Sequence, residues 1–541
     1  MGRRKTRHNI EEWKTRLERA KNFRETKIEQ TWRMALSQYK GESEDDFLEA
    51  ENIHVNLAFP TIKVLLRASC SENPYIYITG TRPWFEESAR VLQFLENRLW
   101  RMQERKAIVR LIVLDALLLS VGYGMSHVMP NPGTGLPDVY LTRVSPYDLW
   151  IEPGAVNVED AYYVFRRVVL SREEAKKRWP KANLPSAKIK SLESGLEMQS
   201  DSDQLENVHD DTLGRVEVYE VHDQLHHEIS VISPDYDSFL DPPRQSPYPL
   251  KSLFTQLVFN EIVDEHYGIA DLEPVMEQQR ELDRLRTLML VHTKRFNRKY
   301  KLQKHSADKE ALDALESGED GVIVQMNDID GLQPITDAPL SSDVYNYQAL
   351  IRNDHREITG INEYLQAGQV GGTKTAYEAE QIMAGARLRL GEKVDLVGDF
   401  AERVAFKDIE IMKKLYPSPQ VAQFYGPDGE VQWRIVQKEE LQGEHFVEVH
   451  SGSMRPRDES ANFQRAILLY QTFANDPAVN HEALLNTVMG LMNVRDKNAL
   501  LSQAPVSPRL LGVGQGVNPR SQELPNPNAV MQAVGRGGLF R

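Results

Sequence analysis

The sequence predicts an α+β fold that is mainly helical. Apolar residues recur at helical spacing through residues 271–300, 342–358 and 376–415. Between residues 123 and 259 the spacing changes to the alternation that is typical of strands. A chain of 541 residues exceeds one typical domain, so we expect three or four modules.

The first part of the chain is expected to be helical with one strand. Residues 9–40 have the pattern of an amphipathic helix, and residues 56–70 of a second, apolar one. Residues 73–80 alternate like a strand. Residues 85–121 are helical, with a break near Glu104. The candidate packing residues of the first helix are Ile10, Trp13, Leu17, Phe23, Trp32 and Tyr39.

A strand-rich region follows. Strands are expected at residues 123–129, 139–151, 161–170, 215–221, 227–232 and 253–259. Ser171 and Glu174 have the spacing of a capping box, which predicts a short helix that ends by Pro180. Residues 181–212 are polar without a clear period and are expected to form a surface loop.

The centre of the chain contains a helix with a basic end. Pro274 would lie in the first turn of the helix at residues 271–300, where proline is tolerated. Its basic cluster consists of Lys294, Arg295, Arg298, Lys299, Lys301 and Lys304. Cations suit the carboxyl end of a helix, but the cluster could also contact phosphate or a partner. Two β-like runs at residues 321–326 and 331–335 precede the helix at residues 342–358.

The longest predicted helix follows a glycine-rich loop at residues 360–375. Thr375 and Glu378 form a capping box, and the helix extends to about Leu415. At a rise of 1.5 Å per residue it is a rod of roughly 60 Å. We expect such a rod to span the molecule or to pack on copies of itself, rather than lie inside one compact domain.

The remainder alternates between short strands and helices. Strands are expected at residues 431–436 and 445–450. Helices are expected at residues 458–475, 481–492 and 495–502, and residues 504–541 are expected to be mostly disordered.

The charge, the cysteine count and the apolar segments of the chain argue against several classes of function. The formal net charge of −14 argues against tight nucleic-acid binding but permits DNA to slide past a repelling surface. The single cysteine, Cys70, excludes an intramolecular disulfide framework and a cysteine-based zinc cluster. Residues 107–121 are apolar but too short for a membrane span, and Arg110 and Asp115 interrupt them, so we expect a buried helix.

No catalytic constellation stands out. Residues 368–375 (GQVGGTKT) resemble a nucleotide-binding loop, but Thr373 occupies the position before Lys374 where that motif needs glycine. The segment also follows a helix rather than a strand, so an interhelical loop is favoured. Cys70 lies in an apolar helical pattern and is expected to be buried and inert.

The sequence indicates a metal site as weakly as it indicates a catalytic site. His226, His227 and Glu228 fall in a probable strand, where neighbours point to opposite faces. Residues 264–266 (DEH) are expected to be a solvated turn. We expect no metal, no cofactor and no catalytic residue.

The order of these parts resembles that of portal proteins, the head-to-tail connectors of tailed double-stranded DNA bacteriophages. Four stretches of the chain carry the resemblance, which covers about residues 50–500. They are residues 144–180 (with VSPYDLWIEP, EDAYYV and SREEAKKRWP), 267–275 (YGIADLEPV), 360–380 (GINEYL to KTAYEAE) and the helical C-terminal region.

The resemblance implies a portal-type fold with wing, stem, clip and crown regions. The regions are the wing (residues 1–265 and 376–455), a first stem helix (266–298), a clip (299–340), a second stem helix (341–360), a tunnel loop (361–375), a crown (456–503) and a tail (504–541). It implies a tunnel loop containing Gln366, Gly368, Gln369, Gly371, Gly372, Thr373 and Lys374.

The same resemblance implies a function without chemistry. Subunits would form a homo-oligomeric ring of about twelve at one capsid vertex of the virion, after assembly in the host cytoplasm. Double-stranded DNA would pass through without sequence recognition. The implied protein partners are the terminase motor, the major capsid and scaffolding proteins and a tail adaptor, with no membrane. Two alternatives remain open: another virion assembly protein without a channel, or a nucleotide-using packaging enzyme, which would need a nucleotide loop and paired acidic metal ligands.

Overall fold

The computed structural model describes most of the chain. The described residues are 9–42, 52–70, 72–132, 135–182, 184, 215–295, 300–302, 332–334, 340–361, 376–416, 420–425, 431–449, 459–473, 484–485 and 488. Helix predominates over strand among them, and every strand pair is antiparallel, which confirms the mainly helical α+β prediction.

The chain divides into two compact units, Met1–Pro456 and Arg457–Arg541. The second unit contains α14 (Glu459–Phe473), within the helix predicted at residues 458–475. The other two helices predicted there, and the tail, lie mostly or wholly outside the described residues. All other elements belong to the first unit.

The N-terminal helix is continuous but changes its winding once. It consists of α2 (Ile10–Arg24), a π-helical segment η1 (Glu25–Glu29) and α3 (Gln30–Lys40), and ends at Gly41 with a positive φ. Its extent matches the predicted helix, whereas the π-helical segment was not predicted. Trp13 and Leu17 of α2 pack on one hydrophobic core, and Trp32 of α3 packs in another.

The next helices surround the main core. They are α4 (Ala58–Ser69), α5 (Glu86–Met102) and α6 (Arg105–Leu119), with β1 (Ile76–Gly80) between the first two. The chain turns between α5 and α6 at Glu104, whose φ is +49°, so the predicted break is confirmed. α6 and Cys70 are buried, as predicted.

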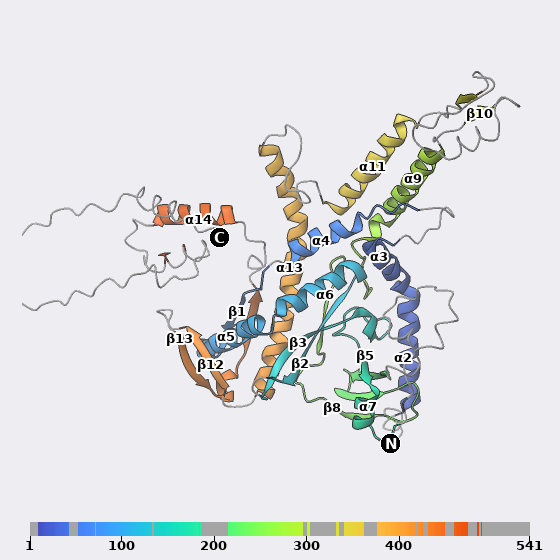
Figure 1. Ribbon diagram of the computed structural model, residues 1–541. Coiled ribbons are helices and arrows are strands. Elements are labelled where there is room, and N and C mark those ends of the chain that lie inside the picture. Colours follow the sequence, from blue (N-terminus) through green and yellow to red (C-terminus); the bar gives the residue numbers. More distant parts are fainter. Residues whose placement is uncertain are drawn as a thin grey trace, which may run out of the picture. The chain divides into compact units, whose positions relative to one another are not determined.

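Two antiparallel sheets form the strand-rich region (Figure 1). The three-stranded sheet has the order β3 (Pro137–Val144), β2 (Gly122–Pro130), β9 (Phe254–Leu257). The five-stranded sheet has the order β4 (Leu149–Ile151), β5 (Tyr163–Ser171), β6 (Arg215–Asp223), β7 (Glu228–Ile232), β8 (Asp241–Gln245). Strand β8 was not predicted because its sequence, DPPRQ, contains two prolines. Its place at the sheet edge explains how they are accommodated.

The two faces of the five-stranded sheet are both covered. One face packs on α2 through Tyr219 and Val221, and the other buries Val216 and Val218 beside α7 (Arg172–Arg178). The capping box predicted for α7 is present, since Ser171 accepts from the Glu174 backbone and Glu174 accepts from Ser171.

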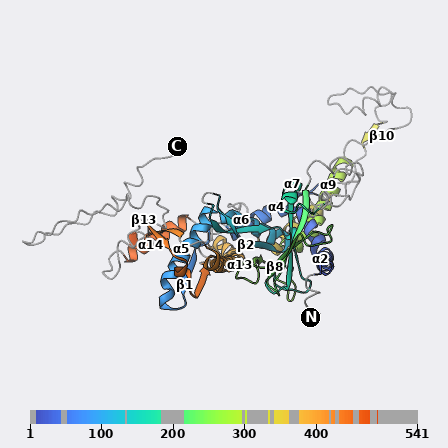
Figure 2. The same cartoon turned by 90° about the horizontal axis from the view of Figure 1, so that it is seen from below.

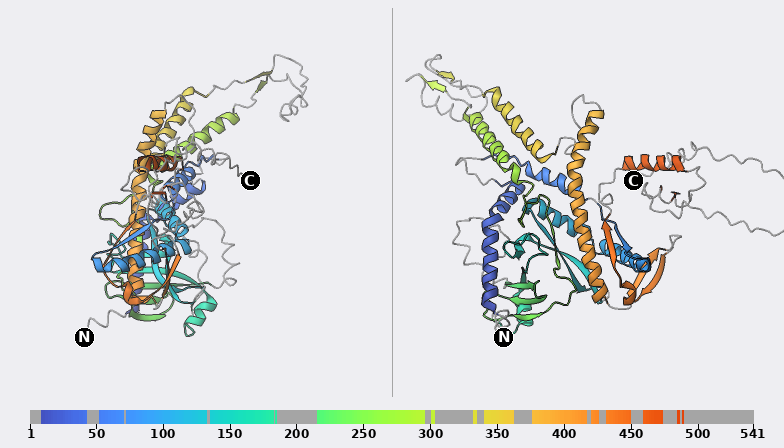
Figure 3. Two further views of the ribbon diagram at one scale, coloured as in Figure 1. Left: turned by 90° about the vertical axis from the view of Figure 1, so that its left-hand side faces the viewer. Right: turned by 180° about the vertical axis from the view of Figure 1, so that it is seen from behind.

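A helical hairpin follows the sheets. A 3-10 turn η4 (Glu273–Val275) contains Pro274 and leads into α9 (Met276–Arg295), and α11 (Ser342–Thr359) runs beside it (Figures 1 and 3). Between them, β10 (Tyr300–Leu302) pairs with β11 (Leu332–Pro334). β11 lies within a predicted β-like run and β10 was not predicted, while the run at residues 321–326 lies outside the described residues.

Helix α13 (Ala376–Leu415) has the 40 residues that were predicted. Its second half carries core residues, including Val397, Phe400, Val404 and Ile409, and it contacts α4, α5, β2, β3 and β9 (Figure 2). The second half of the rod is therefore buried within the first unit, whereas the side chains of residues 376–389 lie outside the described residues. The apolar positions of the second half face helices and sheets of the same subunit on several sides.

The last strands close the first unit. β14 (His445–Val449) pairs with β1, far away in the sequence, and β13 (Val431–Val436) pairs with β12 (Gln420–Tyr425), which was not predicted. In the described part of the chain, none of the helices combines the length and apolar character that crossing a bilayer requires.

Candidate functional site

The helical hairpin of α9 and α11 is held to the rest of the first unit by a set of side-chain contacts. Gln279, Asp283 and Thr287 are four residues apart, so they share one face of α9. The extended segment 52–57 lies along this face, and its backbone N–H groups donate to all three side chains. We name this set of contacts the clasp.

The clasp consists of hydrogen bonds between groups that are buried or partly buried. The Val55 N–H donates to Asp283 Oδ1 at 2.9 Å, and the Ile53 N–H donates to Thr287 Oγ1 at 3.0 Å. His54 Nδ1 lies 2.6 Å from Asp283 Oδ2. Gln279 is 2% exposed and returns a hydrogen bond to the Val55 carbonyl. Burial makes each of these bonds costly to break, so the clasp fixes α9 to the body.

The two helices of the hairpin meet along one stripe of α11. Ile351 and His355 are buried there, and burial lowers the pKa of His355 to about 4. Nearer the tip, the Tyr347 hydroxyl donates to Glu281 of α9. Asp271, two residues before η4, forms an ion pair with Lys393 of α13 at 2.8 Å, so the segment that leads into the hairpin is tied to the long helix.

A buried charge cluster fastens α13 to α5 and α6. Arg105 Nη1 lies 2.8 Å from Glu96 and 2.6 Å from Asp408, and all three side chains are fully buried. Arg105 also donates to Gln103 and to the Val139 carbonyl. Two carboxyl groups face one guanidinium. Burial raises the pKa of Glu96 to about 8, although the charge of the nearby Arg105 lowers it, and the proximity of Asp408 raises it further. We name Glu96, Arg105 and Asp408 the buried triad.

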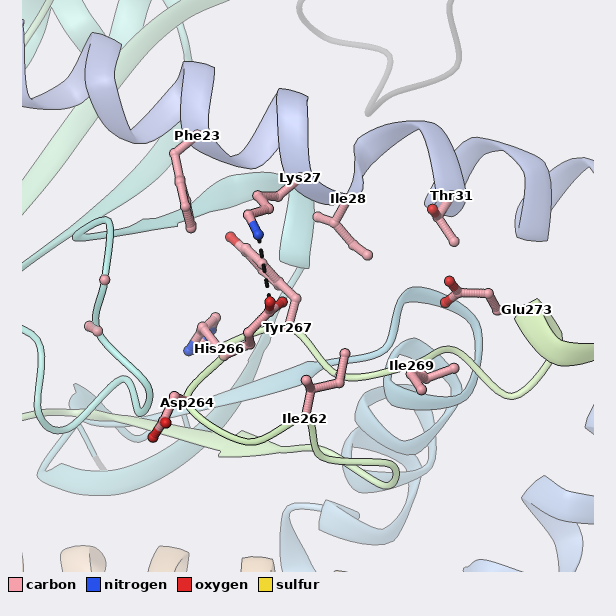
Figure 4. Close-up of a pocket in the computed structure, with 14 residues that line it drawn as sticks. Phe23, Lys27, Ile28, Thr31, Ile262, Asp264, His266, Tyr267, Ile269 and Glu273 are labelled. Carbon is pink, nitrogen blue, oxygen red and sulfur yellow. Dashed lines mark ion pairs between the residues drawn. The ribbon is translucent and has the colours of Figure 1, made fainter.

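A cavity of about 350 Å³ lies beside the π-helical segment (Figure 4). Phe23, Lys27 and Ile28 line it from the N-terminal helix, and residues 262 and 264–269 line it from the opposite side. The one ion pair drawn across it joins Lys27 and Glu265 at 3.6 Å.

His266 lines this cavity, and its burial differs from the prediction made from the sequence. Asp264 and Glu265 are exposed, but His266 is buried, so the predicted solvated turn is wrong at this residue. Its ring lies 2.6 Å from the Tyr123 hydroxyl and 2.8 Å from the Val156 carbonyl, and burial lowers its pKa to about 4. Both ring nitrogens are engaged, so the ring is held as a structural link rather than as a base facing the cavity.

The other predicted histidine site also differs. His226 and His227 lie in the turn between β6 and β7, not in a strand, and His227 has a φ of +59°. His226 Nδ1 is 2.8 Å from Asp223, and His227 Nε2 is 2.8 Å from the Tyr248 carbonyl. Across the described residues, no three histidine, cysteine, aspartate or glutamate side chains are grouped to hold a metal ion. Burial raises the pKa of the Cys70 thiol to about 11, which suits an unreactive side chain.

Most residues of the predicted loop and basic cluster lie outside the described residues. Lys294 is exposed near the end of α9, while Arg295 lies in α9 and Lys301 in β10. Glu378 lies in the first turn of α13, but its predicted cap Thr375 is outside the described residues. Also outside them are Arg298, Lys299, Lys304, Gln366, Gly368, Gln369, Gly371, Gly372, Thr373 and Lys374.

Sequence reasoning did not find the clasp or the buried triad. The only signal in the sequence that could have indicated the clasp is the four-residue spacing of Gln279, Asp283 and Thr287 in α9. Within the triad, the contact between Arg105 and Asp408 joins residues 303 positions apart, and no local pattern in the sequence marks it.

No protein-family model matches the chain, and a search of curated proteins finds no significant match. A functional proposal therefore depends on the sequence motifs and on the contacts described above.

Proposed function

We propose that this chain is a subunit of a portal-type ring, through which genomic DNA of a tailed bacteriophage enters and leaves the capsid. The proposal starts from the order of sequence motifs. The observation that supports it most is the helical hairpin, which the clasp anchors at one side and which an ion pair links to the 40-residue helix α13.

The anchoring suits a mechanical role. The clasp holds α9 by backbone donors, and the buried triad holds α13, so the two long elements are fixed to one body. A subunit of a channel wall needs such fixed rods, because neighbouring copies then meet in a constant geometry. The net charge of −14 would limit adhesion of DNA phosphates to the wall.

The enzyme alternative has less support. The loop that resembles a nucleotide site lacks the glycine before Lys374. The most strongly buried ionisable side chains described here, those of the triad, are bonded to one another inside the core. They occupy no cleft that a substrate could enter.

The test is the state of the purified full chain. Light scattering should give a mass of roughly 740 kDa for about twelve copies of 61.9 kDa, and negative-stain images should show rings with a central hole. A monomer that hydrolyses ATP would overturn the proposal in favour of an enzyme. Assemblies without an axial hole would favour the virion assembly protein that forms no channel.

A further inference from the structure

The cavity beside the π-helical segment has the volume and the apolar wall of a small-molecule site. Its volume of about 350 Å³ falls within the range of about 300–1,000 Å³ that is usual for ligand pockets. Ile28, Ile262 and Ile269 line it, and the last two keep part of their apolar surface accessible. The π-helical segment contributes Lys27 and Ile28, and π-helical turns often occur at functional sites.

The charges that line the cavity are unbalanced. Asp264, Glu265 and Glu273 contribute three carboxylates, whereas Lys27 is the only lysine or arginine among the described lining residues. The Lys27 ammonium lies 3.6 Å from Glu265. The exposed Glu273 side chain has no ion pair or hydrogen bond with another described residue. In Figure 4 it lies across the cavity from Lys27, with apolar side chains between them. The cavity therefore offers an unneutralised carboxylate next to an apolar wall.

This arrangement selects the chemistry of a ligand. An anion would find only the Lys27 ammonium, which is already paired, and would face three carboxylates. A neutral molecule would gain nothing from Glu273 beyond an ordinary hydrogen bond. A primary ammonium donates charge-assisted hydrogen bonds to a carboxylate, and an alkyl chain attached to it gains free energy by leaving water for the apolar wall.

We propose that this cavity binds an alkylammonium ion, with the cation at Glu273 and the alkyl chain against Ile28, Ile262 and Ile269. This group occurs both in free alkylamines and in the lysine side chains of other proteins. The proposal does not depend on the ring. A bound ligand would bridge the N-terminal helix and the segment that leads into α9, since both line the cavity.

Three ligands of equal chain length test the charge. Hexylamine is a cation at pH 7, 1-hexanol is neutral and hexanoate is an anion. In isothermal titration calorimetry with the full chain, hexylamine should bind with a Kd of about 1 mM. Hexanol should bind at least about fivefold more weakly, and hexanoate should show no binding. Absence of hexylamine binding, or equal affinity for hexanol or hexanoate, would overturn the proposal.

A lysine derivative distinguishes the two sources of the ligand. Nα-acetyl-lysinamide presents the same ammonium and alkyl stem on a peptide backbone. Tighter binding of this compound than of hexylamine would indicate a lysine of a partner protein, and weaker binding would indicate a free amine. Binding of neither compound refutes the site for both sources.

Two variants and one control test the location. Glu273→Gln should weaken hexylamine binding about fivefold, the loss expected for an exposed ion pair. Glu277→Gln removes an exposed carboxylate one turn further on, outside the cavity lining, and should leave the affinity unchanged. Thr31→Phe places a ring in the cavity and should abolish binding, with circular dichroism confirming that the variant is folded. Wild-type affinity in Glu273→Gln or in folded Thr31→Phe would place the ligand elsewhere and overturn the proposal. Ring formation by the wild-type chain tests the proposed function separately.

Discussion

Replacing Arg105 by methionine should destabilise the first unit by about 4 kcal/mol, because removal of one partner from a buried ion pair typically costs about 3–5 kcal/mol. Methionine keeps much of the side-chain volume, so the loss comes from the contacts. Arg105 holds Glu96 at 2.8 Å and Asp408 at 2.6 Å, and it also bonds to Gln103 and to the Val139 carbonyl. The Asp408 carboxylate would remain fully buried without a cation, next to the carboxyl group of Glu96.

Urea unfolding at pH 7, followed by tryptophan fluorescence, measures this free energy. Trp100 is a suitable local reporter, since its indole N–H donates to Glu96 at 3.0 Å. The matched control is Glu96→Gln, which resembles the protonated carboxyl and should cost less than about 1 kcal/mol, because the pKa of Glu96 is raised to about 8. A loss below about 1 kcal/mol for Arg105→Met, or an equal loss for Glu96→Gln, would refute the reasoning.

Four further predictions concern the pH dependence of stability, the clasp and the loop. Native Glu96 keeps a proton that the unfolded chain releases, so the thermal midpoint should fall as pH rises from about 6.5 to 8, and Glu96→Gln should flatten this fall. Native His266 stays neutral to about pH 4, so the midpoint should also fall on acidification below pH 6.5, and less so in His266→Gln. Asp283→Ala leaves the Val55 N–H without its acceptor and should cost about 2 kcal/mol, with faster proteolysis near residue 55. An unchanged cleavage rate would contradict the clasp. Deleting residues 367–373 should leave rings intact but reduce the DNA retained in assembled particles, whereas loss of assembly would assign this segment a structural role.

The sequence predicted the elements that local chemistry determines. The limits of α13, the break at Glu104 and the capping box of Ser171 all follow from residues within one or two turns of the feature. β8 was missed because edge position, which tolerates its prolines, is a property of the whole sheet. The buried triad joins distant residues through burial, so no local pattern predicts it.

The candidate site was predictable only in outline. The two helices of the hairpin were expected at nearly the observed residues, but their anchoring depends on the segment 52–57, more than 200 positions away. The portal-type ring remains a prediction.

The π-helical turn at Glu25–Glu29 sets the rotational phase of the N-terminal rod. Trp13 and Trp32 lie on either side of it and insert into separate hydrophobic cores. Each residue advances an α-helix by about 100°, so deleting a single one within this turn would rotate α2 by that angle and swing Trp13 away from its sheet. The number of residues in this turn is therefore constrained more tightly than the identity of their side chains. Natural relatives should differ here by substitutions rather than by insertions or deletions.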